Sequence, residues 1–406
     1  MVWIPVISQI TLGAFAFLPF LQHQISISRW LKNPLKYPKE APKDELMILL
    51  PVWNEGKIIE QKLDNLASHD KIKSSMLIID SASDDNTVEL VNDWISNNES
   101  RFQSIELIEM EERLGKTTAV YRALKYLSQQ NFDGLILMTD ADAEISEGSV
   151  ERMYGWFSDS TMGVVGVKAI RKQSLSSERQ YREMFETIRS AESNFDSTPF
   201  LEGSCMMWRS NALDLSELDT LSNADDAQIA TAVRLSGLRS IFDANASFSD
   251  IAPPTIEGQR RQKIRRAQGL QNLLRRQKNN PKLGSFSKFR RILKRQNYLH
   301  NISPFFTLGA GLSGLARWIL VGINGMPAGN EAIIHASLGV VELFCLTSWL
   351  CTRQGIILPF LGKIGNVMTG LEYLLIARLN SLRGITSHIW DQHSDTRELI
   401  SSKKEN

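Results

Sequence analysis

The sequence has few of the residues that build disulfide frameworks or soft-metal sites. Among its 406 residues only three are cysteines, Cys205, Cys345 and Cys351, and their spacing matches no metal-ligand pattern. So small a number excludes a disulfide-stapled scaffold and fits a reducing compartment. Internal repeats and low-complexity segments are also missing, so nothing in the sequence indicates a repeat protein.

Acidic residues are missing altogether between Gly258 and Asn330, although lysines and arginines are frequent there. This block can therefore face anionic phosphates or an anionic membrane surface. Formal charge is missing from Val2 to Gln22, a mostly apolar run that is long enough to span a bilayer. The positive-inside rule places the basic flank after this run, and everything beyond it, in the cytoplasm; that flank contains Arg29, Lys32, Lys36 and Lys39. The alternative, a cleaved signal peptide, would carry its positive charges before the apolar run.

The overall composition is close to that of an average globular protein, with 43% hydrophobic and 22% charged residues. A mean hydropathy of −0.18 is too polar for a protein that is mostly transmembrane. We expect a transmembrane anchor over residues 1–24, a proline-containing linker over 25–45, an α/β domain over 46–280, an interfacial helix and membrane helices over 281–380, and a cytoplasmic tail over 381–406.

A short apolar run, Leu135 to Met138, is typical of a strand that is buried on both faces, as in a parallel sheet. Similar runs alternate with helical patterns from Leu46 onward. The pattern predicts strands at 46–50, 76–79, 105–108 and 135–138, helices at 55–68, 84–97 and 115–129, further strands at 162–169 and 205–208, and a helix at 225–235. Repeated βα units of this kind imply an α/β fold with a doubly wound, mostly parallel sheet.

Apolar stretches return in the C-terminal part. Residues 288–295 combine basic and apolar side chains, which predicts an amphipathic helix in the membrane interface. Three apolar runs follow at 302–323, 332–351 and 356–377, and each contains ionisable residues that are costly at mid-bilayer. We expect the first two runs to span the membrane, and the third to span it or to form a re-entrant or interfacial helix.

Two carboxylates, Asp140 and Asp142, directly follow the central strand. Ligands bind at the carboxyl ends of strands in open α/β sheets, and two carboxylates there can share one divalent metal with a nucleotide diphosphate. Asp-x-Asp alone is a weak signal, because it also occurs in many solvated turns. Three further polar loops strengthen the signal, because each follows a predicted strand and would lie along the same edge of the sheet: 51–55, 80–87 and 113–116.

The spacing of these loops resembles that of membrane-attached family 2 glycosyltransferases of the GT-A fold, in the branch of polysaccharide synthases and lipid-linked sugar transferases. The resemblance covers residues 46–271 and rests on five short motifs. Their residues are Pro51, Asn54 and Glu55; Asp80, Ser83, Asp85 and Thr87; Gly115 and Lys116; Asp140 and Asp142; and Gly203 and Ser204. Ser81 and Ala82 depart from the second Asp and the Gly of the family's Asp-Asp-Gly-Ser motif.

The resemblance implies roles for these residues. The donor nucleotide would be bound by Pro51, Asn54, Glu55, Asp80, Ser83, Lys116 and Asp140, with Asp80 at the base. Asp140 and Asp142 would hold Mg²⁺ or Mn²⁺, with Asp142 making most of the metal bond. Inverting members use the Asp of a Glu-Asp pair to take the acceptor proton; here that base would be Asp226, with Asp225 in place of the Glu. The alternative interpretation of this pair is two N-terminal helix residues that the helix dipole favours.

Gln262, Arg265 and Arg266 resemble the Gln-x-x-Arg-Trp signature of membrane polysaccharide synthases. By that resemblance Arg265 would hold the diphosphate leaving group. Gln262 and Arg266, together with Gly203 and Ser204, would lie on the acceptor side. Arg266 replaces the tryptophan that supports the acceptor sugar in processive synthases, which argues against a processive enzyme. A basic helix on the membrane surface is the other interpretation of this segment.

We therefore expect a metal-dependent, inverting transfer of a sugar from a nucleotide diphosphate sugar to a membrane-held acceptor, which is a lipid phosphate carrier or a glycan. A processive membrane polysaccharide synthase is the alternative within the same class. A catalytically silent membrane scaffold that has kept the fold is the alternative outside it. The expected protein is integral to the membrane, has its catalytic domain in the cytoplasm and has no nucleic-acid partner.

Overall fold

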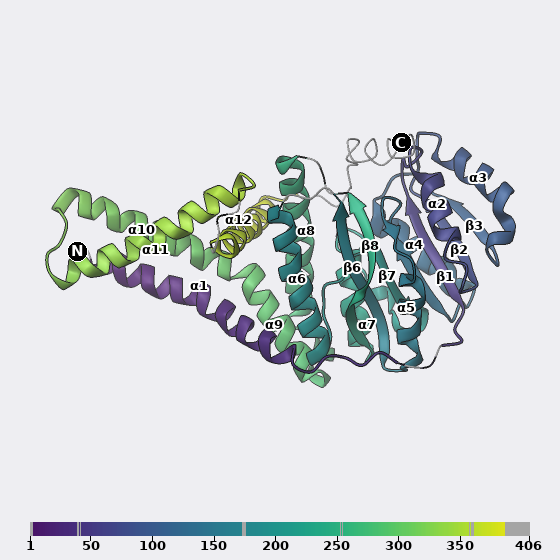
Figure 1. Ribbon diagram of the computed structural model, residues 1–406, viewed down its shortest axis with the longest axis horizontal. Coiled ribbons are helices and arrows are strands. Elements are labelled where there is room, and N and C mark those ends of the chain that lie inside the picture. The colour runs from purple at the N-terminus through teal and green to yellow at the C-terminus, as the bar shows by residue number, and fades with distance from the viewer. Residues whose placement is uncertain are drawn as a thin grey trace.

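The computed structural model describes residues 3–38, 40, 42–172, 176–251, 253, 255–356, 358 and 361–385. An α/β domain lies at one end of an elongated molecule (Figure 1). Long helices extend away from it at the other end, among them α1 (Trp3–Trp30), α10 (Ser303–Asn324) and α11 (Asn330–Arg353). Between these two parts stand α6 (Ser176–Phe195) and α8 (Ile256–Gln277), which Figure 1 shows beside the sheet.

The sheet has eight strands in the order β3-β2-β1-β4-β7-β6-β8-β5. Their bounds are β1 (Leu46–Val52), β2 (Ser74–Asp80), β3 (Ile105–Glu109), β4 (Leu135–Thr139), β5 (Glu144–Ile145), β6 (Met162–Lys172), β7 (Cys205–Arg209) and β8 (Arg239–Ile251). β1 to β4 pair in parallel, as do β6 and β8, whereas β7 is antiparallel to β4 and β6 and β5 is antiparallel to β8. The prediction of an α/β fold with a mostly parallel sheet is confirmed.

Successive side chains of the strands enter two hydrophobic clusters, one on each face of the sheet. On β1, for example, Leu50 belongs to one cluster and Leu49 to the other, and both are fully buried. The helices of this domain also include α2 (Ile59–Ala67), α3 (Thr87–Asn98), α4 (Lys116–Gln129), α5 (Ser149–Gly155) and α7 (Asp225–Leu235). α2 begins later than predicted, because the Ile58 N–H donates to the Glu55 carbonyl at 2.9 Å in a turn that precedes it.

Three helical segments are long and apolar enough to cross a membrane: 3–30, 287–324 and 330–353. Arg317 contacts Glu342 and His335, and all three lie within two of these segments. Arg317 is fully buried, and it donates hydrogen bonds to Glu342 at 2.7 Å and to Gln9 at 3.0 Å. Pairing of this kind makes a charge tolerable at membrane depth. The three segments coincide with the N-terminal apolar run and the first two C-terminal runs, which the sequence predicts to span a membrane.

Two C-terminal helices connect this bundle to the α/β domain. In α9 (Ser287–Asn301) the apolar residues Phe289 and Leu293 pack with Leu273 and Leu274 of α8 in one buried cluster. The prediction that this helix lies in the membrane interface is wrong for its apolar face, because that face contacts protein. α12 (Gly362–Leu382) packs against α8 and α11, and it is not among the possible spans in the described residues.

The N-terminal helix is longer than the predicted anchor of residues 1–24. α1 continues without a break to Trp30, and its last turns pack on α6. Ile27 lies in a cluster with Ile188 and Ala191, and the Trp30 ring stacks on Phe195 with 4.3 Å between centroids. A continuous helix thus ties the membrane part to the α/β domain. The predicted tail lies outside the described residues from 386 onward.

Candidate active site

The loops after β1 and β2 are joined by hydrogen bonds. The Asn54 N–H donates to Ser83 Oγ at 2.8 Å, and the Glu55 N–H donates to Thr87 Oγ1 at 2.8 Å. Asn54 takes the left-handed backbone conformation, with φ 53°, that brings its N–H toward the second loop. The two loops form one edge at the carboxyl ends of the strands, as predicted.

Asp80 ends β2, and its carboxylate organises the second loop. It accepts hydrogen bonds from the Ser83 N–H at 2.9 Å and from Ser83 Oγ at 2.5 Å, and only 2% of the residue is exposed. Ala82, which stands where the family has glycine, has φ 59°. The turn therefore has the left-handed geometry that favours glycine, although an alanine occupies it.

A small pocket opens between the first loop and the start of α4. It is lined by Pro51, Val52, Trp53, Glu55, Ser81, Arg113, Gly115, Lys116, Ala119, Asp140 and Ala141. The Arg113 guanidinium lies 3.3 Å from the centroid of the Trp53 ring, a cation–π contact. Of the predicted donor-side residues, Pro51, Glu55, Lys116 and Asp140 reach this pocket. Asn54, Asp80 and Ser83 instead belong to the junction between the loops.

Lys116 is the first residue of α4 and stands among carboxylates. Its Nζ lies 2.6 Å from Asp140 Oδ1 and 3.4 Å from Asp225 Oδ2. Burial disfavours the charged ammonium, but these two carboxylates outweigh burial and raise the pKa of Lys116. Burial alone would raise the pKa of Asp140, but the Lys116 ammonium outweighs burial and holds that pKa below its usual value. A lysine ammonium and an ionised aspartate therefore meet at the strand end.

Gly203 and Ser204 connect the two acidic pairs. The Gly203 N–H donates to Asp226 Oδ2 at 3.1 Å, and Ser204 Oγ donates to Asp140 Oδ2 at 2.9 Å. Added at Gly203, a Cβ would lie 3.3 Å from Asp226 Cβ and 3.4 Å from Lys116 Nζ, so the missing side chain lets both groups approach the backbone. Gly203 and Ser204, which were predicted for the acceptor side, thus link Asp140 at the strand end to Asp226, the predicted base.

Asp226 has the properties of a proton acceptor near neutral pH. It lies in the first turn of α7, and its Oδ1 accepts a hydrogen bond from the Ala227 N–H at 2.7 Å. Burial, followed by the charges of Asp225 and Glu202, raises the pKa of Asp226 from 3.8 to about 7. A general base works best with a pKa close to the operating pH. The helix dipole also acts on this pair, so the two interpretations of Asp225 and Asp226 are compatible.

The residues at the strand end fit a hard divalent cation. Asp140 and Asp142 offer carboxylate oxygens on one turn, and Mg²⁺ and Mn²⁺ need only one or two such ligands when phosphates supply others. The nearby Cys205 is fully buried, and burial raises the pKa of its thiol to about 12. Within the described residues no cluster of three or more metal-ligating side chains occurs. Such a cation would therefore depend on the donor for much of its coordination.

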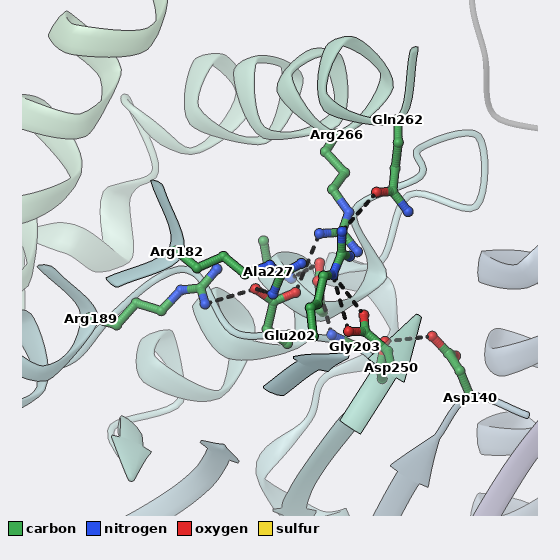
Figure 2. A network of polar contacts seen from close by, with 12 residues as sticks. Asp140, Arg182, Arg189, Glu202, Gly203, Ala227, Asp250, Gln262 and Arg266 are labelled. Atoms are coloured by element: carbon green, nitrogen blue, oxygen red, sulfur yellow. Dashed lines mark hydrogen bonds and ion pairs between the residues drawn. The ribbon is translucent and has the colours of Figure 1, made fainter. Parts of the chain in front are cut away.

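Figure 2 shows how α8 approaches this centre through a polar network. Arg266 donates to Glu202 Oε2 at 3.4 Å, and Gln262 Oε1 accepts from Arg171 at 3.5 Å. The Arg265 backbone contacts the loop before α7, since the Asn223 side chain donates to the Arg265 carbonyl at 3.0 Å. Gln262 and Arg266 thus join the polar network around Glu202, which precedes Gly203, and the Arg265 backbone contacts the loop that leads into α7.

Sequence reasoning missed two residues that support the site. Glu202 directly precedes Gly203 and collects arginines from α6 and α8. Lys62 on α2 is 3% exposed and donates to Thr139 Oγ1 at 2.8 Å and to the Ala143 carbonyl, one on each side of the Asp-x-Asp turn. Burial lowers the pKa of Lys62 to about 8. The position of Glu202 next to the Gly203 motif could have indicated its role, whereas Lys62 lies in an ordinary amphipathic helix.

Two protein-family models match the chain. Glycosyl transferase family 2 matches residues 47–215, and glycosyl transferase family group 2 matches residues 135–333. Together these ranges contain the four loops of the pocket, the Asp225–Asp226 pair and the α8 residues.

Individual proteins agree with these matches. The poly-beta-1,6-N-acetyl-D-glucosamine synthase of Staphylococcus aureus (strain COL) is 26% identical over 252 residues, which are 60% of this chain and 59% of the relative. The synthase of the same name from Staphylococcus epidermidis is 24% identical over 231 residues, 55% of this chain and 54% of the relative. The matches thus span less than two thirds of the length of these curated relatives. Among solved structures, mannosyltransferase PcManGT from Pyrobaculum calidifontis, in complex with GDP-Man and Mn²⁺, is 25% identical, covers 93% of this chain and 99% of its own, and has a TM-score of 0.73.

Proposed function

We propose that this chain, which belongs to glycosyltransferase family 2, transfers a sugar from a nucleotide diphosphate sugar to an acceptor held at the membrane, with inversion at the anomeric carbon. The membrane helices and the mannosyltransferase that shares the fold along almost the whole chain support the proposal. We place the catalytic domain on the cytoplasmic side, because the basic flank follows the first apolar run.

One observation carries the proposal. Asp226 is a largely buried carboxylate with a pKa of about 7, and Gly203 and Ser204 link it to Asp140 at the strand end. In the proposed reaction Asp226 takes the proton from the acceptor hydroxyl. The acceptor oxygen forms its bond to the anomeric carbon as the bond from that carbon to the nucleotide diphosphate breaks. The expected rate contribution of such a base is about 10²–10⁴-fold.

The donor side needs positive charge for the departing diphosphate. Asp140 and Asp142 would hold Mg²⁺ or Mn²⁺, which when bound would offset the charge of the phosphates. Lys116 holds a positive charge at the same strand end, 2.6 Å from Asp140. Arg265 on α8 would supply a guanidinium for the leaving group. The hydrogen bonds among Asn54, Asp80 and Ser83 would hold the two loops on the nucleotide side of the pocket in a fixed position.

A processive polysaccharide synthase is the second candidate, because the curated relatives carry that name. The presence of Arg266 argues for short products. A long cation that pairs with Glu202 replaces the flat apolar ring that a neutral sugar chain would stack on. We therefore propose the addition of one or a few sugars to each acceptor. Mass analysis of lipid-extracted products made with excess donor distinguishes the two candidates, since a ladder reaching tens of sugars on one acceptor would establish the synthase.

The test of the proposed function is a donor screen. The purified full chain in detergent is mixed with Mg²⁺ or Mn²⁺ and a panel of nucleotide sugars, and the released nucleotide diphosphate is measured with and without a chelator and with added membrane lipid extract. We expect release from one donor that requires the metal and increases with the extract. Equal background release from every donor, under every condition, would contradict a transferase and favour a silent scaffold.

A further inference from the structure

Lys62 is a buried charge that the proposed reaction does not use. On α2 it lies in the core-facing stripe, together with Ile59, Leu63 and Leu66, and only 3% of the residue is exposed. Lysine is almost never buried to this extent unless its ammonium is paired, because the transfer of a charge out of water is costly. An apolar residue at this position would complete the stripe without that cost. The partners of the ammonium therefore indicate what the lysine does.

The Lys62 ammonium connects the two ends of the Asp-x-Asp turn. Its Nζ donates to Thr139 Oγ1 at 2.8 Å and to the Ala143 carbonyl. Thr139 is the last residue of β4, and Ala143 is the last residue before β5, so the two acceptors lie on either side of Asp140 and Asp142. Both acceptor residues are at most 1% exposed. One side chain from α2 therefore fixes the backbone before the first aspartate and after the second.

The same two acceptor residues also take part in the hydrogen bonds of the turn itself. The Ala143 N–H donates to the Asp140 carbonyl at 3.2 Å, and Thr139 Oγ1 donates to the Ser204 carbonyl at 2.9 Å. The Thr139 hydroxyl can accept from Lys62 and donate to Ser204, because a hydroxyl does both. Ser204 Oγ in turn donates to Asp140 Oδ2 at 2.9 Å. A chain of hydrogen bonds therefore runs from Lys62 through Thr139 and Ser204 to the Asp140 carboxylate.

A second residue of α2, Asn65, holds the strand that follows the turn. Asn65 Nδ2 donates to the Ile145 carbonyl at 3.1 Å, and Asn65 Oδ1 accepts from the Ile145 N–H at 2.9 Å. Asn65 thus pairs with β5 as a neighbouring strand would, and it lies about one helical turn after Lys62. The hydrogen bonds of Asn65 go to the strand, whereas those of Lys62 go to the turn. The two contributions of α2 can therefore be separated by substitution.

We propose that Lys62 is a positioning residue for the metal: its ammonium fixes the backbone on both sides of Asp140 and Asp142 and thereby sets the spacing at which the two carboxylates meet a divalent cation. This inference rests on the proposed function, because it assigns a support to the metal site of that reaction. Since the described part of the chain has no cluster of three or more metal-ligating side chains, the cation depends on the placement of this pair. Loss of a residue that orients metal ligands typically lowers metal affinity by about 10–100-fold.

The test measures nucleotide binding, so that it does not depend on sugar transfer. ADP, CDP, GDP and UDP are titrated into the purified full chain in detergent, once with Mn²⁺ and once with EDTA, and the ratio of the two dissociation constants is the metal effect. Lys62→Met keeps the length of the side chain and removes the donor. For the nucleotide that the wild type binds most tightly, we expect Lys62→Met to raise the dissociation constant with Mn²⁺ by about 10–100-fold and to leave the constant with EDTA nearly unchanged.

The direction of the change separates position from charge. Lys62→Met removes a positive charge from the neighbourhood of the cation, so electrostatics alone would strengthen Mn²⁺ binding. Weaker binding therefore reports the placement of the carboxylates. Thr139→Val removes one of the two acceptors at nearly constant size and should give a smaller loss of the same kind. Asn65→Ala is the matched control: it removes two hydrogen bonds between the same helix and β5, and it should lower the temperature of unfolding while the metal effect stays close to that of the wild type.

A purely structural role of Lys62 gives a different result. It would lower the temperature of unfolding in Lys62→Met and leave the metal effect at its wild-type size, and that outcome would overturn this inference alone. A larger metal effect in Lys62→Met, or an equal loss of the metal effect in Asn65→Ala, would also overturn it. Wild-type protein that binds all four nucleotides equally well with Mn²⁺ and with EDTA would instead overturn the metal site of the proposed function, and this inference with it.

Discussion

Replacement of Asp225 by asparagine should move the pH dependence of turnover. The wild-type pKa of Asp226 is about 7 instead of 3.8, so its ionised form is disfavoured by about 4 kcal/mol. Burial is the largest cause, and the charge of Asp225 is the second. Asp225→Asn removes that charge while it keeps the size of the side chain, and it leaves Lys116 beside the site without its 3.4 Å partner. Both effects favour ionisation of Asp226.

The size of the shift follows from elementary electrostatics. Two unit charges a few ångströms apart in a partly buried site interact by on the order of 1–3 kcal/mol, which corresponds to about one pH unit or more. A base with a pKa near 7 is roughly one-tenth ionised at about pH 6, whereas a base with a pKa near 6 is roughly half ionised. At about pH 6, turnover expressed as a fraction of its high-pH plateau should therefore be about fivefold higher in Asp225→Asn than in the wild type.

The assay is the pH profile of kcat for wild type and Asp225→Asn, measured with saturating donor and metal between about pH 5 and pH 9. Because the base must be deprotonated, kcat should rise with pH in both proteins, and the rise should come at lower pH in the variant. Leu221→Ala, a change at an exposed residue a few positions earlier, is the control and should keep the wild-type profile. A rise that stays in place or moves to higher pH in Asp225→Asn would refute the electrostatic reasoning.

Three further predictions address the metal, the buried acid and the helix contact. Asp142→Asn should abolish the metal-dependent part of nucleotide binding, as measured by titration of a nucleoside diphosphate with and without Mn²⁺; a wild-type metal effect would contradict it. Burial raises the pKa of Glu192 to about 7 from 4.5, so this residue's contribution to stability is complete below about pH 4.5 and is lost as pH rises through about 7, a loss of up to about 3 kcal/mol. Glu192→Gln should remove that part of the pH dependence from thermal unfolding curves, and an unchanged difference between about pH 5 and pH 8 would contradict the assignment. Gly269→Ala should lower stability by about 1–3 kcal/mol, because its Cβ would overlap Asn223 Oδ1, whereas Gly284→Ala meets nothing within 4 Å and should not.

The strand ends and their loops could be predicted from the sequence because their signals are local. Each short apolar run, such as Leu135 to Met138, ends in a polar loop, and parallel strands bring those ends to one edge. Gly203 and Asp226 are 23 residues apart in the chain, and the prediction placed both at the site because each matches a position in a family motif. Their direct hydrogen bond was beyond such reasoning.

Features that depend on packing between distant segments were missed. The apolar face of α9 has the composition of a membrane-surface helix, but Phe289 and Leu293 are covered by α8, and only the tertiary structure decides between protein and lipid. α6 is too polar to stand out, yet it supplies Arg182 and Arg189 to Glu202 across the domain. β8 has a bulge in its pairing with β6 that breaks a simple alternation. Long-range contacts of this kind leave little trace in a local pattern.

The proposed role of Asp226 is tested most directly by Asp226→Asn, with turnover and donor binding measured on one preparation. The donor identified by the screen is used at saturating concentration with Mn²⁺ or Mg²⁺, and binding of its nucleoside diphosphate is titrated in parallel. We predict that turnover falls by about 10²–10⁴-fold while the dissociation constant of the nucleotide stays close to that of the wild type. Wild-type turnover in Asp226→Asn, with nucleotide binding intact, would contradict the account and place the base elsewhere.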